Sequence, residues 1–122
     1  MKENASSPDI CERTFDFAVR VVKLCENLDN IPGTSRILSN QLLRSGTSIG
    51  ANVEEAQAGQ SKADFNSKLC IACKEARESH YWLRLLIAAE ILPAHQLAPI
   101  TDEANQLVAI LTTIIKNSRA SS

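Results

Sequence analysis

The segment that decides the fold, residues 62–91, reads KADFNSKLCIACKEARESHYWLRLLIAAEI. Along it, apolar and small side chains recur at alternating spacings of four and three residues: Phe65, Leu69, Ala72, Ala76, Ser79, Leu83 and Leu86. This spacing is typical of a helix packed lengthwise against others. A second stripe lies beside the first: Ile71, Glu75, Glu78, Trp82, Leu85 and Ala89. Ser61 is suited to cap the helix, and Pro93 ends it.

Three other segments have the same periodicity, which predicts helices over 9–30, 35–58 and 97–117 as well as 62–91. The inner stripe of the last helix includes Leu107, Leu111 and Ile114, and the first helix has a second stripe of its own: Phe15, Ala18, Val22 and Cys25. Thr34 or Ser35 is the expected cap of the second helix. Gly59 suits a left-handed residue after its end.

Four helices joined by short loops predict a single all-α domain over residues 1–122, an antiparallel up-down-up-down four-helix bundle. One bundle interior cannot cover two apolar stripes on the same helix. The second stripes therefore predict a homo-oligomer with these stripes at its interface.

The composition excludes several classes of function. The chain carries 13 Lys and Arg against 14 Asp and Glu, so it lacks the basic excess of a protein that coats nucleic acid. Any nucleic-acid binding should be weak and salt-sensitive, through a local cluster such as Arg36, Arg44, Lys62 and Lys68. The first residues are polar and no apolar run would span a membrane, which predicts a cytoplasmic protein.

The sequence shows no constellation for metal binding or catalysis. The four cysteines are expected to be reduced thiols. Cys70 and Cys73 form a single CxxC without a second pair or a preceding strand, and we interpret them as small core residues. No Glu stands three residues before His80 or His95, as a di-iron bundle would require. We expect no metal, no cofactor and no enzymatic activity.

The segment 44–56, RSGTSIGANVEEA, holds two glycines four residues apart inside a predicted helix. Each costs about 1 kcal/mol relative to Ala in that setting. Gly46 and Gly50 therefore predict a close approach between helices, with a ligand groove as the alternative.

A polar row shares one side of this helix: Arg44, Ser48, Asn52 and Glu55. Folding the hairpin about residue 60 brings Arg44 opposite Glu75 and Glu78, which predicts a partly buried ion network. The network either fixes the helix register or binds a ligand or partner. His80 and Trp82 follow Glu78 on the predicted helix 62–91. We interpret His80 either as a pocket residue or as an interior or interface histidine.

Two motifs carry a family resemblance, RSxxSIxxNVxEA at 44–56 and KEAxExxxWL at 74–83, with Phe65 between them. They resemble the bacterial four-helix-bundle proteins associated with intervening sequences of large-subunit (23S) rRNA. That family is similar to the accessory variability proteins of diversity-generating retroelements, which form pentameric barrels and bind nucleic acid and a reverse transcriptase. The resemblance implies a ring-shaped homo-oligomer, with a pentamer favoured, and an RNA or protein partner such as a reverse transcriptase.

Two functions of different classes follow from these observations. The first is a non-enzymatic homo-oligomeric scaffold or adaptor that engages a protein or RNA partner. The alternative is a small-molecule or metal-binding bundle with a polar site at Arg44, Glu75, Glu78 and His80.

Overall fold

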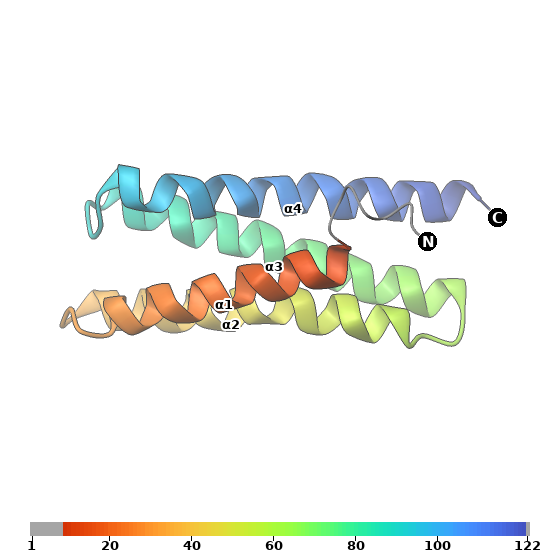
Figure 1. The fold of residues 1–122 in the computed structure, drawn as a ribbon, viewed down its shortest axis with the longest axis horizontal. Coiled ribbons are helices and arrows are strands. Elements are labelled where there is room, and N and C mark those ends of the chain that lie inside the picture. The colour runs from red at the N-terminus through yellow and green to blue at the C-terminus, as the bar shows by residue number, and fades with distance from the viewer. Residues whose placement is uncertain (1–8, 122) are drawn as a thin grey trace.

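The computed structural model describes residues 9–121, which form four helices: α1 (Ile10–Leu28), α2 (Thr34–Gln57), α3 (Lys62–Ala88) and α4 (Ala94–Ala120). The helices run up and down in turn along one long axis (Figure 1). No strand occurs between residues 9 and 121. The all-α four-helix bundle predicted from the sequence is confirmed.

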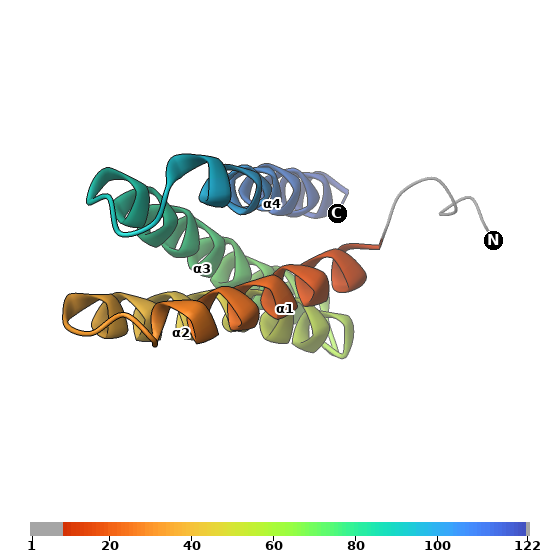
Figure 2. The same ribbon diagram turned by 60° about the vertical axis from the view of Figure 1, so that its left-hand side comes forward.

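The centre of the bundle is the contact between α2 and α3. α1 packs along α2 and α4 packs along α3, whereas α1 and α4 meet over a short stretch only, as the turned view in Figure 2 shows. That stretch includes an ion pair in which Arg13 Nε donates to Glu103 Oε2 at 2.7 Å and Arg13 Nη2 donates to Glu103 Oε1 at 3.0 Å. The molecule is therefore two helical hairpins joined mainly through α2 and α3.

The buried residues follow the inner stripes that the sequence predicts. In α3 they are Leu69, Ala72, Cys73, Ala76, Ser79, Leu83 and Leu86. In α4 the stripe shifts at its end: Ile114 is only partly buried against the core, and its neighbour Ile115 is buried. The second stripe of α1 divides: Cys25 is buried, whereas Phe15 and Val22 remain 59% and 40% exposed.

The two glycines of α2 allow it to lie close against α1. A Cβ atom at Gly46 would lie 2.8 Å from Val21 Cγ2, and one at Gly50 would lie 3.3 Å from Thr14 Oγ1. These contacts are with a neighbouring helix of the same chain. Tight helix packing, the first of the two readings, therefore accounts for both glycines.

Two expectations about helix ends are wrong, and both concern glycine. The residue before α2 is Gly33 at φ 90°, so neither Thr34 nor Ser35 is the cap residue. Gly59 does not adopt a positive φ. It is instead a point of close approach, where a Cβ would lie 3.1 Å from Asp64 Cβ. The predicted cap of α3 is confirmed, since Ser61 Oγ accepts from the Asp64 backbone N–H at 3.1 Å.

The loop between α3 and α4 contains an unusual backbone conformation. Glu90 has φ 61°, the left-handed region, and the Ile91 N–H donates to the Leu86 carbonyl at 3.1 Å. This hydrogen bond ends α3 through a left-handed residue, a position that glycine usually occupies. α4 then begins at Ala94, three residues before the predicted start, because the Pro93 carbonyl accepts its first backbone hydrogen bonds.

Two further expectations change with the structure. Cys73 is buried, but Cys70 is exposed, so the interpretation of both as core residues is wrong for Cys70. The expected basic cluster does not form. Arg36 lies in the first turn of α2 and Lys62 lies beyond the other end of that helix, whose 24 residues span about 36 Å. No helix in the described part of the chain is both long and apolar enough to cross a membrane.

Candidate functional site

The predicted ion network forms between α2 and α3. Arg44 Nη1 lies 3.3 Å from Glu75 Oε1, and Arg44 Nη2 donates to Glu78 Oε2. Trp82 Nε1 donates to the same Glu78 oxygen at 3.1 Å. The Arg44 side chain is 50% exposed, whereas Glu75 is 13% exposed. The carboxylates are therefore more covered than the cation that neutralises them.

The other members of the polar row bond within their own helix. Ser48 Oγ donates to the Arg44 carbonyl at 2.7 Å, and Asn52 Nδ2 donates to the Ser48 carbonyl at 2.9 Å. Glu55 is exposed at the surface of α2. The structure thus brings together Arg44 and its partners on α3, and leaves these three residues outside the network.

A hydroxyl pair lies between the same two helices in the core. Ser45 Oγ and Ser79 Oγ are 2.8 Å apart, and both residues are fully buried. Ser79 Oγ also donates to the Glu75 carbonyl at 2.9 Å. The sequence placed both serines on inner stripes, but spacing alone did not indicate that they pair. Together with the ion network they specify the register of α2 against α3.

His80 lies on α3 two residues from both Glu78 and Trp82, and it is half-buried. Burial, and then the nearby Arg84 cation, lower the pKa of its imidazole below the usual 6.5, so the ring is neutral at pH 7. The Tyr81 ring packs edge-on against Trp82 with centroids 5.1 Å apart. Among residues 9–121, no hydrogen bond or ion pair joins His80 to Arg44, Glu75 or Glu78, so His80 lies outside the ion network.

The chemistry open to these groups is limited. Arg44 pairs with both carboxylates, one cation against two anions, and Trp82 also donates to Glu78, so these side chains are occupied by contacts within the protein. Within residues 9–121, no three His, Cys, Asp or Glu side chains gather as metal ligands would. The network is suited to hold two helices in register.

An apolar face extends over α1 and α2. Phe15, Val19 and Val22 form one exposed stripe of α1, and Leu43 of α2 is exposed beside it. Contact between Thr14 and Gly50 sets the antiparallel register that places Leu43 near Val22. A groove of about 310 Å³ lies in this region, lined by Phe15, Ala18, Thr47, Gly50, Ala51 and Glu54. We refer to Phe15, Ala18, Val19, Val22, Leu43, Thr47 and Ala51 as the apolar face.

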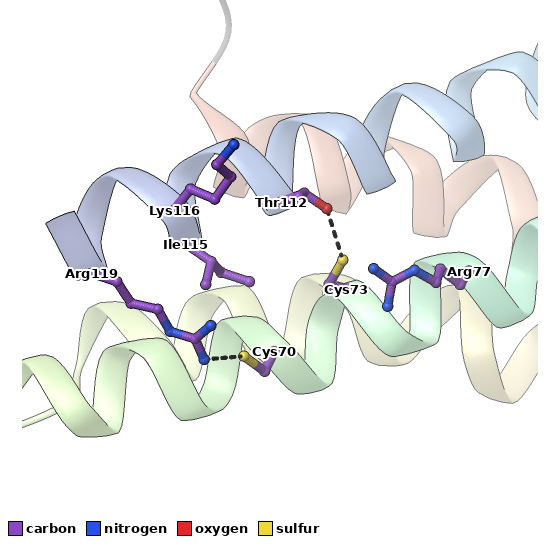
Figure 3. Close-up of a pocket in the computed structure, with 7 residues that line it drawn as sticks. All are labelled: Cys70, Cys73, Arg77, Thr112, Ile115, Lys116 and Arg119. Carbon is purple, nitrogen blue, oxygen red and sulfur yellow. Dashed lines mark hydrogen bonds between the residues drawn. The ribbon is translucent and has the colours of Figure 1, made fainter.

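A basic groove, which was not predicted from the sequence, lies between α3 and α4. It has a volume of about 210 Å³ and is lined by Cys70, Cys73, Arg77, Thr112, Ile115, Lys116 and Arg119 (Figure 3). One signal was present in the sequence: after Glu103 the chain contains no Asp or Glu, although Lys116 and Arg119 follow. We refer to these seven lining residues as the basic groove.

The comparisons with known proteins agree with the fold. A search of curated proteins finds no match. A crystal structure of a protein of unknown function from the S23 ribosomal protein family of Bacteroides thetaiotaomicron VPI-5482 matches with a TM-score of 0.83. The two chains are 44% identical, and the match covers 88% of this chain and 99% of that chain. The family model described as 23S rRNA-intervening sequence protein matches residues 7–113. With the four-helix fold and this match over most of its length, the chain belongs to the 23S rRNA-intervening sequence protein family.

Proposed function

We propose that the protein is a non-enzymatic homo-oligomeric scaffold, which joins copies of itself through the apolar face and offers its remaining surface to a protein or RNA partner. The observation that carries this proposal is the exposure of Phe15, Val19 and Val22 in one stripe beside Leu43. Scattered exposed apolar residues are ordinary, but a contiguous stripe at helical spacing is typical of an interaction surface.

The energetics favour association that depends on concentration. Burying a large apolar side chain fully is worth about 1.5 to 3 kcal/mol, so covering the exposed half of each of these four residues is worth about 1 kcal/mol each. The cost of association is about 4 to 15 kcal/mol. The apolar face supplies a part of this, and flanking contacts must supply the rest.

A second apolar surface supports a ring over a symmetric pair. Ala109, Ile110, Thr113 and Ile114 of α4 line another groove, of about 270 Å³. A closed ring needs two different surfaces on each copy, because each copy meets its two neighbours through unlike faces. The apolar face lies on the α1–α2 hairpin and the α4 surface on the other hairpin, which meets this requirement. The family resemblance favours five copies in the ring.

The partner is part of the proposal. The resemblance favours RNA or a protein such as a reverse transcriptase. The near balance of 13 basic and 14 acidic residues gives a nucleic-acid polymer little attraction, which favours a protein. RNA binding should then be weak, and should fall by more than about tenfold between 50 and 200 mM salt. Electrophoretic mobility-shift titrations at both salt concentrations measure this.

The test of the ring uses two variants that each damage one surface. Val19→Glu places a charge on the apolar face, and Ala109→Glu places one on α4; both positions are exposed, so neither change strains the fold. By light scattering, each variant should be smaller than the wild type. Mixing them should give a one-to-one heterodimer, because each retains the surface that the other has lost.

Ile37→Glu is the matched control, since Ile37 is 63% exposed and lies outside both surfaces. It should assemble like the wild type. Far-ultraviolet circular dichroism should show all three variants to be helical. A wild-type monomer would refute the scaffold, and failure of the two variants to combine would refute the ring.

A further inference from the structure

Two arginine side chains from different helices extend into the basic groove and toward each other. Arg77 on α3 and Arg119 on α4 reach into it from its two ends, toward the thiols of Cys70 and Cys73 (Figure 3). Arg119 Nη2 lies 3.5 Å from Cys70 Sγ. Lys116 lies at the rim, with its amine turned away from the thiols (Figure 3).

The cations of the groove have no carboxylate partner among the residues that the structure describes. Within residues 9–121, no ion pair joins Arg77, Lys116 or Arg119 to a carboxylate, in contrast to Arg13 and Arg44. On the same helix as Arg77, Glu75 and Glu78 pair with Arg44 of α2 instead. In a chain whose net charge is −1, this is a local concentration of positive charge, and like charges directed into one groove favour an anion between them.

The remaining lining provides hydrogen-bonding groups rather than a second charge. Thr112 Oγ1 lies 3.5 Å from Cys73 Sγ at the floor of the groove, so a hydroxyl and a thiol face the space between the arginines. Two guanidinium forks with an adjacent hydroxyl match the oxygen atoms of a tetrahedral oxyanion. A single carboxylate would engage only one fork fully.

We propose that the basic groove binds the phosphate group of a small ligand, up to the size of a nucleotide. The groove has a volume of about 210 Å³. This is room for a phosphate and part of the alcohol or sugar attached to it, but not for several nucleotides in a row. The inference does not rest on the scaffold function, because the groove lies on α3 and α4, away from the apolar face.

The test is calorimetric titration of the native assembly with inorganic phosphate, adenosine monophosphate and adenosine at low salt. Phosphate and the monophosphate should bind with dissociation constants at or below the millimolar range, and adenosine should not bind. Arg77→Gln and Arg119→Gln should each weaken binding by about tenfold. Lys116→Gln should weaken it less, because the amine is turned outward. Arg36→Gln makes the same change of charge far from the groove and should bind like the wild type.

A second readout separates anion binding from thiol chemistry. Cys70 is exposed at the groove, so bound phosphate should slow its alkylation, as measured by mass spectrometry of the Cys70 peptide. Cys70→Ser should retain binding, since the arginines carry it. Loss of phosphate binding in Cys70→Ser, with both arginines intact, would overturn the assignment.

The source of the phosphate is resolved by comparing ligands. If adenosine monophosphate binds more tightly than inorganic phosphate, the groove also contacts the group attached to the phosphate. If the two affinities are equal, the groove recognises the phosphate alone. An RNA oligonucleotide that binds only when its 5′ end is phosphorylated would identify the end of an RNA as the source. No binding of phosphate or monophosphate at about 10 mM, or binding that both arginine variants retain, would overturn the proposal.

Discussion

Replacing Gly46 by alanine tests whether the close approach of α1 and α2 is as tight as the structure shows. Two opposing effects compete at this position. Alanine inside a helix is favoured over glycine by about 1 kcal/mol. The new methyl group would lie 2.8 Å from Val21 Cγ2 and 2.9 Å from Val21 Cγ1, well inside the separation of about 3.5 to 4.0 Å at which carbon atoms attract.

The contact should outweigh the helix preference. Relieving it requires α1 and α2 to separate by several tenths of an ångström, or Val21 to leave the χ1 rotamer that helices strongly prefer. Overpacking of this kind costs about 1 to 3 kcal/mol. Subtracting the helix preference of about 1 kcal/mol, we expect Gly46→Ala to destabilise the protein by up to about 2 kcal/mol net. Gly50→Ala should be near neutral, because its closest contact is 3.3 Å and the helix preference offsets it.

The assay is urea unfolding followed by circular dichroism at 222 nm, with all variants at one protomer concentration because association contributes to stability. Val21→Ala alone should cost about 2 to 3 kcal/mol through loss of buried methyl groups. The double variant should be no less stable than Val21→Ala, since the methyl at position 46 then fills vacated space. A Gly46→Ala protein more stable than the wild type by about 1 kcal/mol would refute the contact.

Three further predictions concern single side chains. Arg44→Ala should cost about 1 to 2 kcal/mol in a thermal melt, between the values for exposed and buried pairs, because Glu75 is mostly covered while Arg44 is half-exposed; an unchanged melt would show that the network is not structural. Glu90→Gly should stabilise the protein by about 0.5 to 1 kcal/mol by relieving the left-handed backbone, and a loss of stability would contradict the turn. Because the pKa of His80 is lowered on folding, the unfolded chain binds the proton more readily, and stability should fall as pH drops below 6.5; His80→Gln should reduce this fall, and a nuclear magnetic resonance titration with a His80 midpoint at or above 6.5 would refute it.

The contact between α2 and α3 could be predicted from the sequence because short loops leave few registers. A hairpin turning at residue 60 and a common heptad phase place Arg44 opposite Glu75 and Glu78, and the structure shows both contacts. The pairing of Ser45 with Ser79 was not predicted, because the same rule places Ser45 opposite residue 75. The polar row on α2 was overestimated, since Ser48 and Asn52 had the backbone of their own helix as a nearer partner.

Other features depended on backbone details that side-chain patterns do not carry. The left-handed residue near α3 is Glu90, a residue type that gives no such signal, while the expected left-handed Gly59 is not one. The start of α4 was predicted three residues late, because the Pro93 carbonyl accepts its first backbone hydrogen bonds and no side chain caps this end. The basic groove depends on Arg77 and Arg119, from helices distant in sequence, reaching the same space.

The second stripe of α1 shows that periodicity predicts the exposure of only part of a stripe. Phe15 and Val22 were expected at a subunit interface and are exposed, but Cys25 from the same stripe is buried, with Sγ 3.4 Å from the Ser39 carbonyl. An α-helix drifts by about 20° per heptad relative to a strict seven-residue repeat, so a stripe that begins at the surface can end in the core. The exposed part of this stripe, Phe15 to Val22, is what the proposed assembly would cover.

The proposed assembly is tested most directly by the mass of the wild-type protein in solution. Sedimentation equilibrium over a range of protomer concentrations gives this mass without reference to shape. Each chain has a mass of 13.3 kDa, and a pentameric ring would have five times this, about 67 kDa, falling toward smaller species on dilution. A mass of 13.3 kDa at every concentration up to about 100 μM would contradict the scaffold, because the apolar face would then remain exposed to water.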